Sequence, residues 1–178
     1  MKIMLYSGKL FDISNFTEDE IDIEDIAHAL SMTCRFGGHI DAFYSVAEHC
    51  CLLSDYFLNQ WDCPRDAKQA LLHDAAEAYV GDHLKPIKDV LKVEYLEGPI
   101  YITIARRFGI EEEVNNYVKE ADKRILITEM KDLNPRFDVD DWIQGVRPLP
   151  VEIRRWTPDQ AKREFLWRFE DLFGEKNG

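Results

Sequence analysis

The sequence predicts an all-α fold, a single helical bundle of six to seven helices formed by residues 1–178. Apolar residues recur at intervals of three and four along most of the chain, as expected for amphipathic helices. Capping residues, glycines and prolines bound these stretches. The length of 178 residues and a hydrophobic content of 46% suit one domain with one buried core.

The N-terminal segment carries no helical period. Residues 6–11 favour a short strand or hairpin that turns at Gly8 and Lys9. Asp22 is a good N-cap for the first helix. This helix should fade over residues 35–38, where two glycines follow one another.

The middle of the chain predicts further helices. One begins at about Ser45, and the next has Pro64 at its first position and Gly81 as its C-cap glycine. A longer helical region is expected from 87 to 108. Because Gly98-Pro99 interrupts it, we expect two helices or a kink at that point.

The C-terminal part predicts two helices separated by a loop. The first runs from about 112 to 133, before the Asn-Pro pair. Residues 138–150 are acidic and proline-bearing and are expected to form a loop pinned by Trp142. Thr157, followed by proline and by glutamine at the third position, marks the start of the last helix.

The charge balance excludes several classes of protein. Lys and Arg number 22 against 34 Asp and Glu, a formal net charge of −12. This argues against binding a nucleic-acid polymer or an anionic membrane over a broad face. The chain has no apolar run of membrane-spanning length, and its first ten residues have no apolar core long enough for a secretory signal, so we expect neither. Four cysteines without a Cys-x-x-Cys pair are typical of a reduced, cytoplasmic protein, in which cysteine mainly packs.

Four polar residues lie on apolar helical faces, at positions where the periodicity predicts buried side chains. They are His49, His73, Asp74 and Asp122. An unpaired buried carboxylate is costly, and a shared divalent cation would satisfy all four side chains. Zn²⁺, Mn²⁺, Co²⁺ and Fe²⁺ all suit two imidazoles and two carboxylates. A purely structural ion is the weaker interpretation, because structural sites are usually closed and rich in thiolates.

Charged residues near the His-Asp doublet favour chemistry on a phosphate. Glu77 is four residues after His73, near enough to the ion to act as a general acid or base. Asp82 directly follows the glycine at the helix end. In an acidic protein, Lys85 and Lys88 beside such a site favour a phosphate-bearing substrate, although a solvated loop is an equally good interpretation.

The ordered histidines and aspartates resemble the signature of the HD-domain metal-dependent phosphohydrolases. The local strings are similar to those of the YfbR-like deoxynucleotide hydrolases, a group that includes bacterial 5′-nucleotidases and phage dATP triphosphohydrolases (DatZ-like). The strings are EDIAHAL at 24–30, RFGGH at 35–39, YSVAEH at 44–49, LLHDAAE at 71–77, GD at 81–82 and KPIK at 85–88. This resemblance extends over nearly the whole chain.

The resemblance implies a role for each matching residue. The implied metal ligands are His49, His73, Asp74 and Asp122; the implied catalytic residues are Glu77 and Asp82; and the implied substrate contacts are Arg35, Phe36, Lys85 and Lys88. It further implies one catalytic divalent ion, with a second Mg²⁺ if the nucleotide is a triphosphate. A homo-oligomer, dimer or hexamer, is also expected.

We therefore expect a deoxynucleotide hydrolase of a bacterial or phage-infected cell. The first expectation is a dNTP triphosphohydrolase that prefers dATP, in which water activated by the ion attacks the α-phosphorus and releases deoxynucleoside and triphosphate. The string at 35–39 and the basic pairs at 106–107 and 123–124 favour it. One alternative is a 5′-deoxynucleotidase acting on dNMPs. Another is a non-catalytic HD module that senses nucleotides.

Overall fold

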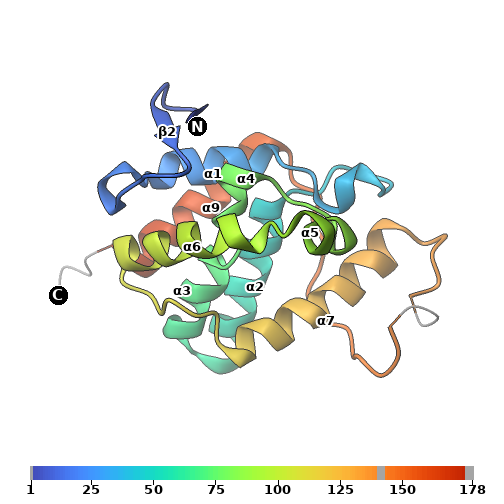
Figure 1. Ribbon diagram of the computed structural model, residues 1–178. Helices are drawn as coiled ribbons and strands as arrows, with labels where there is room; N and C mark the ends of the chain where they lie inside the picture. The colour runs from blue at the N-terminus through green and yellow to red at the C-terminus, as the bar shows by residue number, and fades with distance from the viewer. Residues whose placement is uncertain (1, 140–142, 175–178) are drawn as a thin grey trace.

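The computed structural model describes residues 2–139 and 143–174, and it confirms the all-α prediction (Figure 1). Helices pack into one bundle, and a small hairpin of β1 (Lys2–Met4) and β2 (Leu10–Asp12) adjoins it. The α-helices are α1 (Ile23–Met32), α2 (Val46–Trp61), α3 (Pro64–Leu72), α4 (Glu77–Val80), α5 (Lys85–Leu91), α6 (Glu94–Phe108), α7 (Asn116–Leu133) and α9 (Pro158–Phe173). Short 3₁₀ turns lie at η1 (Glu18–Glu20) and η2 (Arg35–Gly38).

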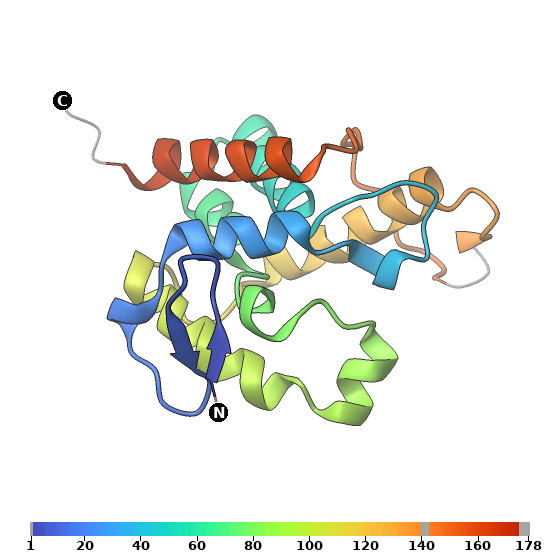
Figure 2. The same ribbon diagram turned by 90° about the horizontal axis from the view of Figure 1, so that it is seen from above.

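Helix α2 forms the centre of the bundle. It packs against α1, α3, α7 and α9, and α9 also runs along α1 (Figure 2). Most residues of α2 are buried, including the neighbours Glu48 and His49. A polar side chain on α2 therefore has to find its partners inside the protein.

Local signals in the sequence position several helix ends as predicted. The Asp22 side chain accepts a hydrogen bond from the amide of Glu24 and caps α1. Ser45 caps α2 in the same way, and Thr157 opens α9 with a complete capping box. The hairpin is also confirmed, but residues 6–8 form its turn rather than a strand, and Gly8 adopts a φ of +80° there.

The helix predicted from Pro64 to Gly81 is interrupted. Helix α3 ends at Leu72, and residues 73–76 follow as tight turns in which amides bond to the third preceding carbonyl, as for Glu77 N to Asp74 O. Helix α4 then ends at Gly81, whose φ of 86° and ψ of 155° are open essentially to glycine alone. Tight turns within helical segments often occur at functional sites.

Two further boundaries differ from the prediction. The break between α5 and α6 falls at Lys92, which has a left-handed φ of 53°, and not at Gly98-Pro99. Pro99 removes one backbone hydrogen bond, and α6 continues through it. Helix α7 starts later than predicted because Asn115 caps it with its side chain. Trp142, expected to pin the following loop, lies outside the described residues.

No helix in the described part of the chain combines the length and apolarity needed to cross a bilayer. The cysteines are free thiols, and Cys50 and Cys51 are buried in α2, consistent with a packing role. Arg106, one of the basic residues considered for substrate contact, instead pairs with Glu112 on the surface.

Glu48 anchors the segment that leads into α9. It is fully buried, and its carboxylate accepts hydrogen bonds from the amides of Arg154, Arg155 and Trp156 at 2.7–2.8 Å. We expect Glu48→Gln to lower the free energy of unfolding by about 1–3 kcal/mol. The reason is that the NH₂ group of glutamine replaces a carboxylate oxygen and faces backbone N–H donors, with which it cannot form a hydrogen bond. Chemical denaturation measures this loss. The exposed control Glu152→Gln should be neutral, and equal effects in both variants would contradict the prediction.

Candidate metal centre

Four side chains from separate parts of the chain converge on one point. Nε2 of His49 lies 3.3 Å from Nε2 of His73 and 3.2 Å from Oδ1 of Asp122. Oδ2 of Asp74 lies 3.5 Å from the His49 nitrogen and 3.3 Å from the His73 nitrogen. The distance between Nε2 of His73 and Oδ1 of Asp122 is longer, at 3.9 Å.

The elements that hold these side chains explain the convergence. His49 is on the first turn of α2, in the core. His73 and Asp74 lie in the tight turns after α3, so both side chains of the doublet reach the same point. Asp122 is on α7, one turn beyond the buried Val118. All four residues proposed from the sequence are thus brought together.

Both imidazoles are oriented for metal binding. His49 Nδ1 lies 2.6 Å from a carboxylate oxygen of Glu129, and His73 Nδ1 lies 2.7 Å from the carbonyl oxygen of Ala70. Because these partners only accept hydrogen bonds, each Nδ1 carries the proton and each Nε2 presents its lone pair. Two lone pairs 3.3 Å apart repel each other unless a proton or a metal ion lies between them. Metal-binding histidines typically have such Nδ1 partners.

The distances between the donors also fit a divalent ion. An ion about 2.0–2.2 Å from each ligand atom places neighbouring ligand atoms roughly 3–3.5 Å apart. The donor atoms of His49, His73 and Asp74 all lie within 4.8 Å of one another, so this cluster could hold a metal ion. The imidazoles are buried, whereas the Asp122 side chain is 43% exposed, so one side of the cluster faces solvent.

The electrostatics of the cluster favour a positive charge. Burial opposes protonation of His73, but Asp74 and the neighbouring Asp122 and Cys50 outweigh it and raise its pKa well above the usual value. Partial desolvation by the surrounding protein likewise opposes ionisation of Asp122, but His49 and His73 hold its pKa well below the usual range. The four groups therefore attract a proton or a metal cation.

A buried carboxylate on α7, Glu129, was missed by the sequence reasoning. It is fully buried and binds Tyr44 Oη at 2.9 Å, Arg35 Nη2 at 3.1 Å and the His49 ring. Burial raises its pKa, but Arg35 and His49 outweigh burial and the net shift is downward. A signal was available, because Glu129 falls four residues after Ile125 on the buried stripe of α7.

Arg35 and Phe36 lie together in the turn η2, at the edge of the cluster. Arg35 Nη1 is 3.5 Å from Oδ2 of Asp74, and its side chain is only 12% exposed. Its Nε has no hydrogen-bond partner among the described residues. Phe36 adopts a left-handed φ of 58°, and its ring centroid lies 5.4 Å from the guanidinium carbon of Arg35.

A cleft of about 490 Å³ opens beside the donor group. His73, Asp74 and Glu77 form one part of its wall, with Lys88 and Glu97 nearby. Glu77 is 5% exposed; Oε1 accepts a hydrogen bond from Lys88 at 2.6 Å, and Oε2 has no partner in the described chain. Burial, with Asp74 and Asp82 nearby, raises the pKa of Glu77 to about 8 despite Lys88.

The remaining predicted site residues lie in different positions. Lys88 bridges Glu77 and Glu97, so it lines the cleft as a paired cation. Lys85 is 83% exposed and pairs with Asp89 on the surface of α5, so the structure does not bring it to the donor group. Asp82 is half-buried, close enough for its charge to raise the pKa values of Glu77 and Arg35.

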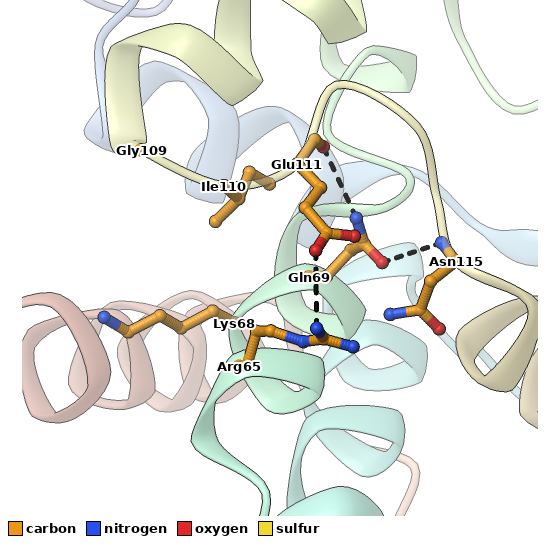
Figure 3. Close-up of a pocket in the computed structure, with 7 residues that line it drawn as sticks. All are labelled: Arg65, Lys68, Gln69, Gly109, Ile110, Glu111 and Asn115. Carbon is orange, nitrogen blue, oxygen red and sulfur yellow. Dashed lines mark hydrogen bonds and ion pairs between the residues drawn. The ribbon is translucent and has the colours of Figure 1, made fainter.

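The segment that precedes α7 is held in place by Gln69 of α3 (Figure 3). Its amide nitrogen donates to the carbonyl oxygens of Glu111 and Glu113, and its amide oxygen accepts from the backbone of Asn115. A second hollow of about 350 Å³ lies here. Glu113 also lines the cleft beside the donor group. Gln69 therefore fixes the part of the cleft wall that precedes Asp122 in the chain.

A divalent ion should stabilise the protein through this cluster. At a free concentration 100 times its Kd, an ion bound only to the native state adds about 2.7 kcal/mol. For a chain of this size, this corresponds to a rise in Tm of roughly 5–10 °C. Thermal unfolding with Zn²⁺, Mn²⁺ and Co²⁺ measures it, and His49→Ala should show no rise. Unchanged melting with every ion would contradict the assignment.

Comparison with known proteins identifies relatives across the chain. It is 36% identical over 177 residues to the uncharacterized protein YfdR of Escherichia coli (strain K12), covering 96% of this chain and 94% of the relative. It is 37% identical over 125 residues to the uncharacterized protein RCAP_rcc00048 of Rhodobacter capsulatus, covering 67% of this chain and 64% of that protein. No family model matches the sequence.

Proposed function

The chain belongs to the same protein family as YfdR of Escherichia coli, and we propose that it is a metal-dependent phosphohydrolase acting on deoxynucleotides. The observation that carries the proposal is the donor group itself. Two imidazole Nε2 atoms and two carboxylates meet beside an open cleft, with the guanidinium of Arg35 at 3.5 Å from Asp74. A cation and a metal site side by side suit a phosphate ester.

The residues that would hold the ion are His49, His73, Asp74 and Asp122. A divalent ion bound by them would supply an activated water and would stabilise charge on the phosphoryl oxygens. Because His49 and His73 are buried and fixed at Nδ1, their Nε2 atoms need little rearrangement on binding. The exposed side of the cluster, at Asp122, is where substrate would approach.

The other side chains would bind and orient the phosphate. Arg35 is largely shielded from solvent, charged and held beside Asp74, so it would bind a phosphoryl oxygen. Glu77 lines the cleft with one oxygen free of partners among the described residues, and would donate a proton to the departing 5′ oxygen. Phe36 beside Arg35 would pack against the nucleoside.

The first candidate substrate is a dNTP, with dATP preferred, as the resemblance in the sequence implies. Hydrolysis at the α-phosphorus would release deoxynucleoside and triphosphate. The cleft wall also bears Glu94, Glu97 and Glu113, so a triphosphate would enter with Mg²⁺ to offset its charge.

A specific observation favours a second candidate, the 5′-deoxynucleotidase. Lys85, expected to hold phosphate, pairs with Asp89 on the outer surface, and four glutamates line the cleft against two lysines. A triphosphate needs more cations and fewer carboxylates around it than this cleft offers. A dNMP carries less negative charge and therefore suits the cleft better.

One screen separates these candidates. The purified protein is incubated with each dNTP and dNMP and with Zn²⁺, Mn²⁺, Co²⁺ or Mg²⁺, and products are identified by chromatography and ³¹P NMR. Tripolyphosphate from dATP supports the first candidate, whereas release of orthophosphate from dAMP alone supports the second. Binding of nucleotides without turnover under any ion would overturn the proposal and favour a nucleotide sensor.

A further inference from the structure

We infer that Glu129 is a positioning residue that fixes His49 and Arg35 as one unit. Its Oε1 lies 2.6 Å from His49 Nδ1 and 2.9 Å from Tyr44 Oη, and its Oε2 lies 3.1 Å from Arg35 Nη2. The side chain is fully buried, so these partners replace water entirely. The inference rests on the proposed metal site and is independent of the reaction catalysed there.

The contact with His49 determines which ring nitrogen can bind a metal. A carboxylate only accepts hydrogen bonds, so His49 keeps its proton on Nδ1 and its lone pair on Nε2. Nε2 is the atom that faces His73, Asp74 and Asp122. Glu129 therefore sets both the tautomer and the rotation of the imidazole, as the outer partner of a metal-binding histidine does.

The contact with Arg35 determines where the cation lies. The guanidinium is largely shielded from solvent, and among the described residues it forms ion pairs with Glu129 and Asp74. With Nη2 held by Glu129, Nη1 stays 3.5 Å from Asp74 Oδ2. The Glu129 carboxylate thus fixes the distance between the Arg35 guanidinium and the metal-donor atoms. Binding a phosphate between the guanidinium and a metal ion depends on this distance.

Glu129→Gln tests this arrangement with almost no change in shape. If the amide oxygen stays on His49, the amide NH₂ faces Arg35 and displaces it. If the amide is reversed, it donates to His49 Nδ1 and moves the ring proton to Nε2, which blocks metal binding. We expect affinity for Co²⁺, measured by competition with a chromogenic chelator, to fall about 10–100-fold.

Glu48→Gln is the matched control, because it alters a glutamate of equal burial one residue from His49 without removing a partner of the ring. It should lower stability and leave Co²⁺ affinity unchanged. Tyr44→Phe removes only the hydroxyl that donates to Glu129 and should cause a smaller loss of affinity. Wild-type affinity in Glu129→Gln, or equal losses in Glu129→Gln and Glu48→Gln, would overturn the inference.

A measurement on the unaltered protein applies even if Glu129→Gln does not fold. In the Zn²⁺-loaded protein, long-range ¹H–¹⁵N NMR should show His49 protonated at Nδ1 and ligated through Nε2. Ligation through Nδ1 would overturn the inference. Neither measurement uses turnover, so a failure of the phosphohydrolase proposal would leave both readouts interpretable.

Discussion

His73→Ala is expected to abolish bound metal and hydrolysis together. The His73 Nε2 atom lies within 3.3 Å of donor atoms of both His49 and Asp74, so its loss opens the centre of the cluster. Because a bound ion supplies several kcal/mol of transition-state stabilisation, we expect kcat/KM to fall by about 10³-fold or more. Elemental analysis of the purified variant and product analysis with dATP and dAMP measure the two losses.

The matched control is His28→Ala. His28 is a half-buried histidine that stacks on Tyr6, away from the donor group. This variant should keep both its metal and its activity. Hydrolysis that survives His73→Ala would show that the metal assignment is wrong, whereas metal retained without hydrolysis would place His73 in catalysis rather than in binding.

Glu77→Gln is expected to separate catalysis from metal binding. Glu77 lines the cleft and contacts Lys88, but its side chain is not part of the donor group formed by His49, His73 and Asp74. Loss of a general acid lowers the rate by about 10²–10⁴-fold. We therefore expect a fall in kcat of this size, with metal content and KM little changed, because the isosteric amide still fills the site but cannot deliver the proton.

The control for this prediction is Glu97→Gln, which breaks the other ion pair of Lys88. If the role of Glu77 were only to hold Lys88, both variants would lose activity equally. A much smaller loss in Glu97→Gln supports proton transfer by Glu77. Loss of metal from Glu77→Gln would contradict the prediction, because it would show that Glu77 contributes to metal binding.

Much of the fold followed from local signals. Asp22, Ser45 and Thr157 cap helices where the sequence placed them, because capping involves only neighbouring residues. The interruption after Leu72 was missed, since the apolar pattern continues smoothly through residues 73–76. The apolar periodicity indicates which residues are buried. Over these four residues it did not distinguish an α-helix from tighter turns.

The candidate site was predicted in part for the same reason. His49, His73, Asp74 and Asp122 stood out because each is polar on an apolar face. Glu129 has this property too, yet none of the side chains that it contacts lies near it in the sequence. Its partners Arg35, Tyr44 and His49 are 80–94 residues away, and only packing reveals them.

The sequence alone determined the fold class, most helix boundaries and the chemical types of the candidate donors, because propensity, capping and burial patterns act over a few residues. The tertiary structure decided which side chains meet. It placed four donors within 3.9 Å of a neighbour, joined His49 to Arg35 through Glu129, and turned Lys85 outward to Asp89. Such distances depend on how helices pack, and a geometric match of a few tenths of an ångström determines whether polar residues form a metal site.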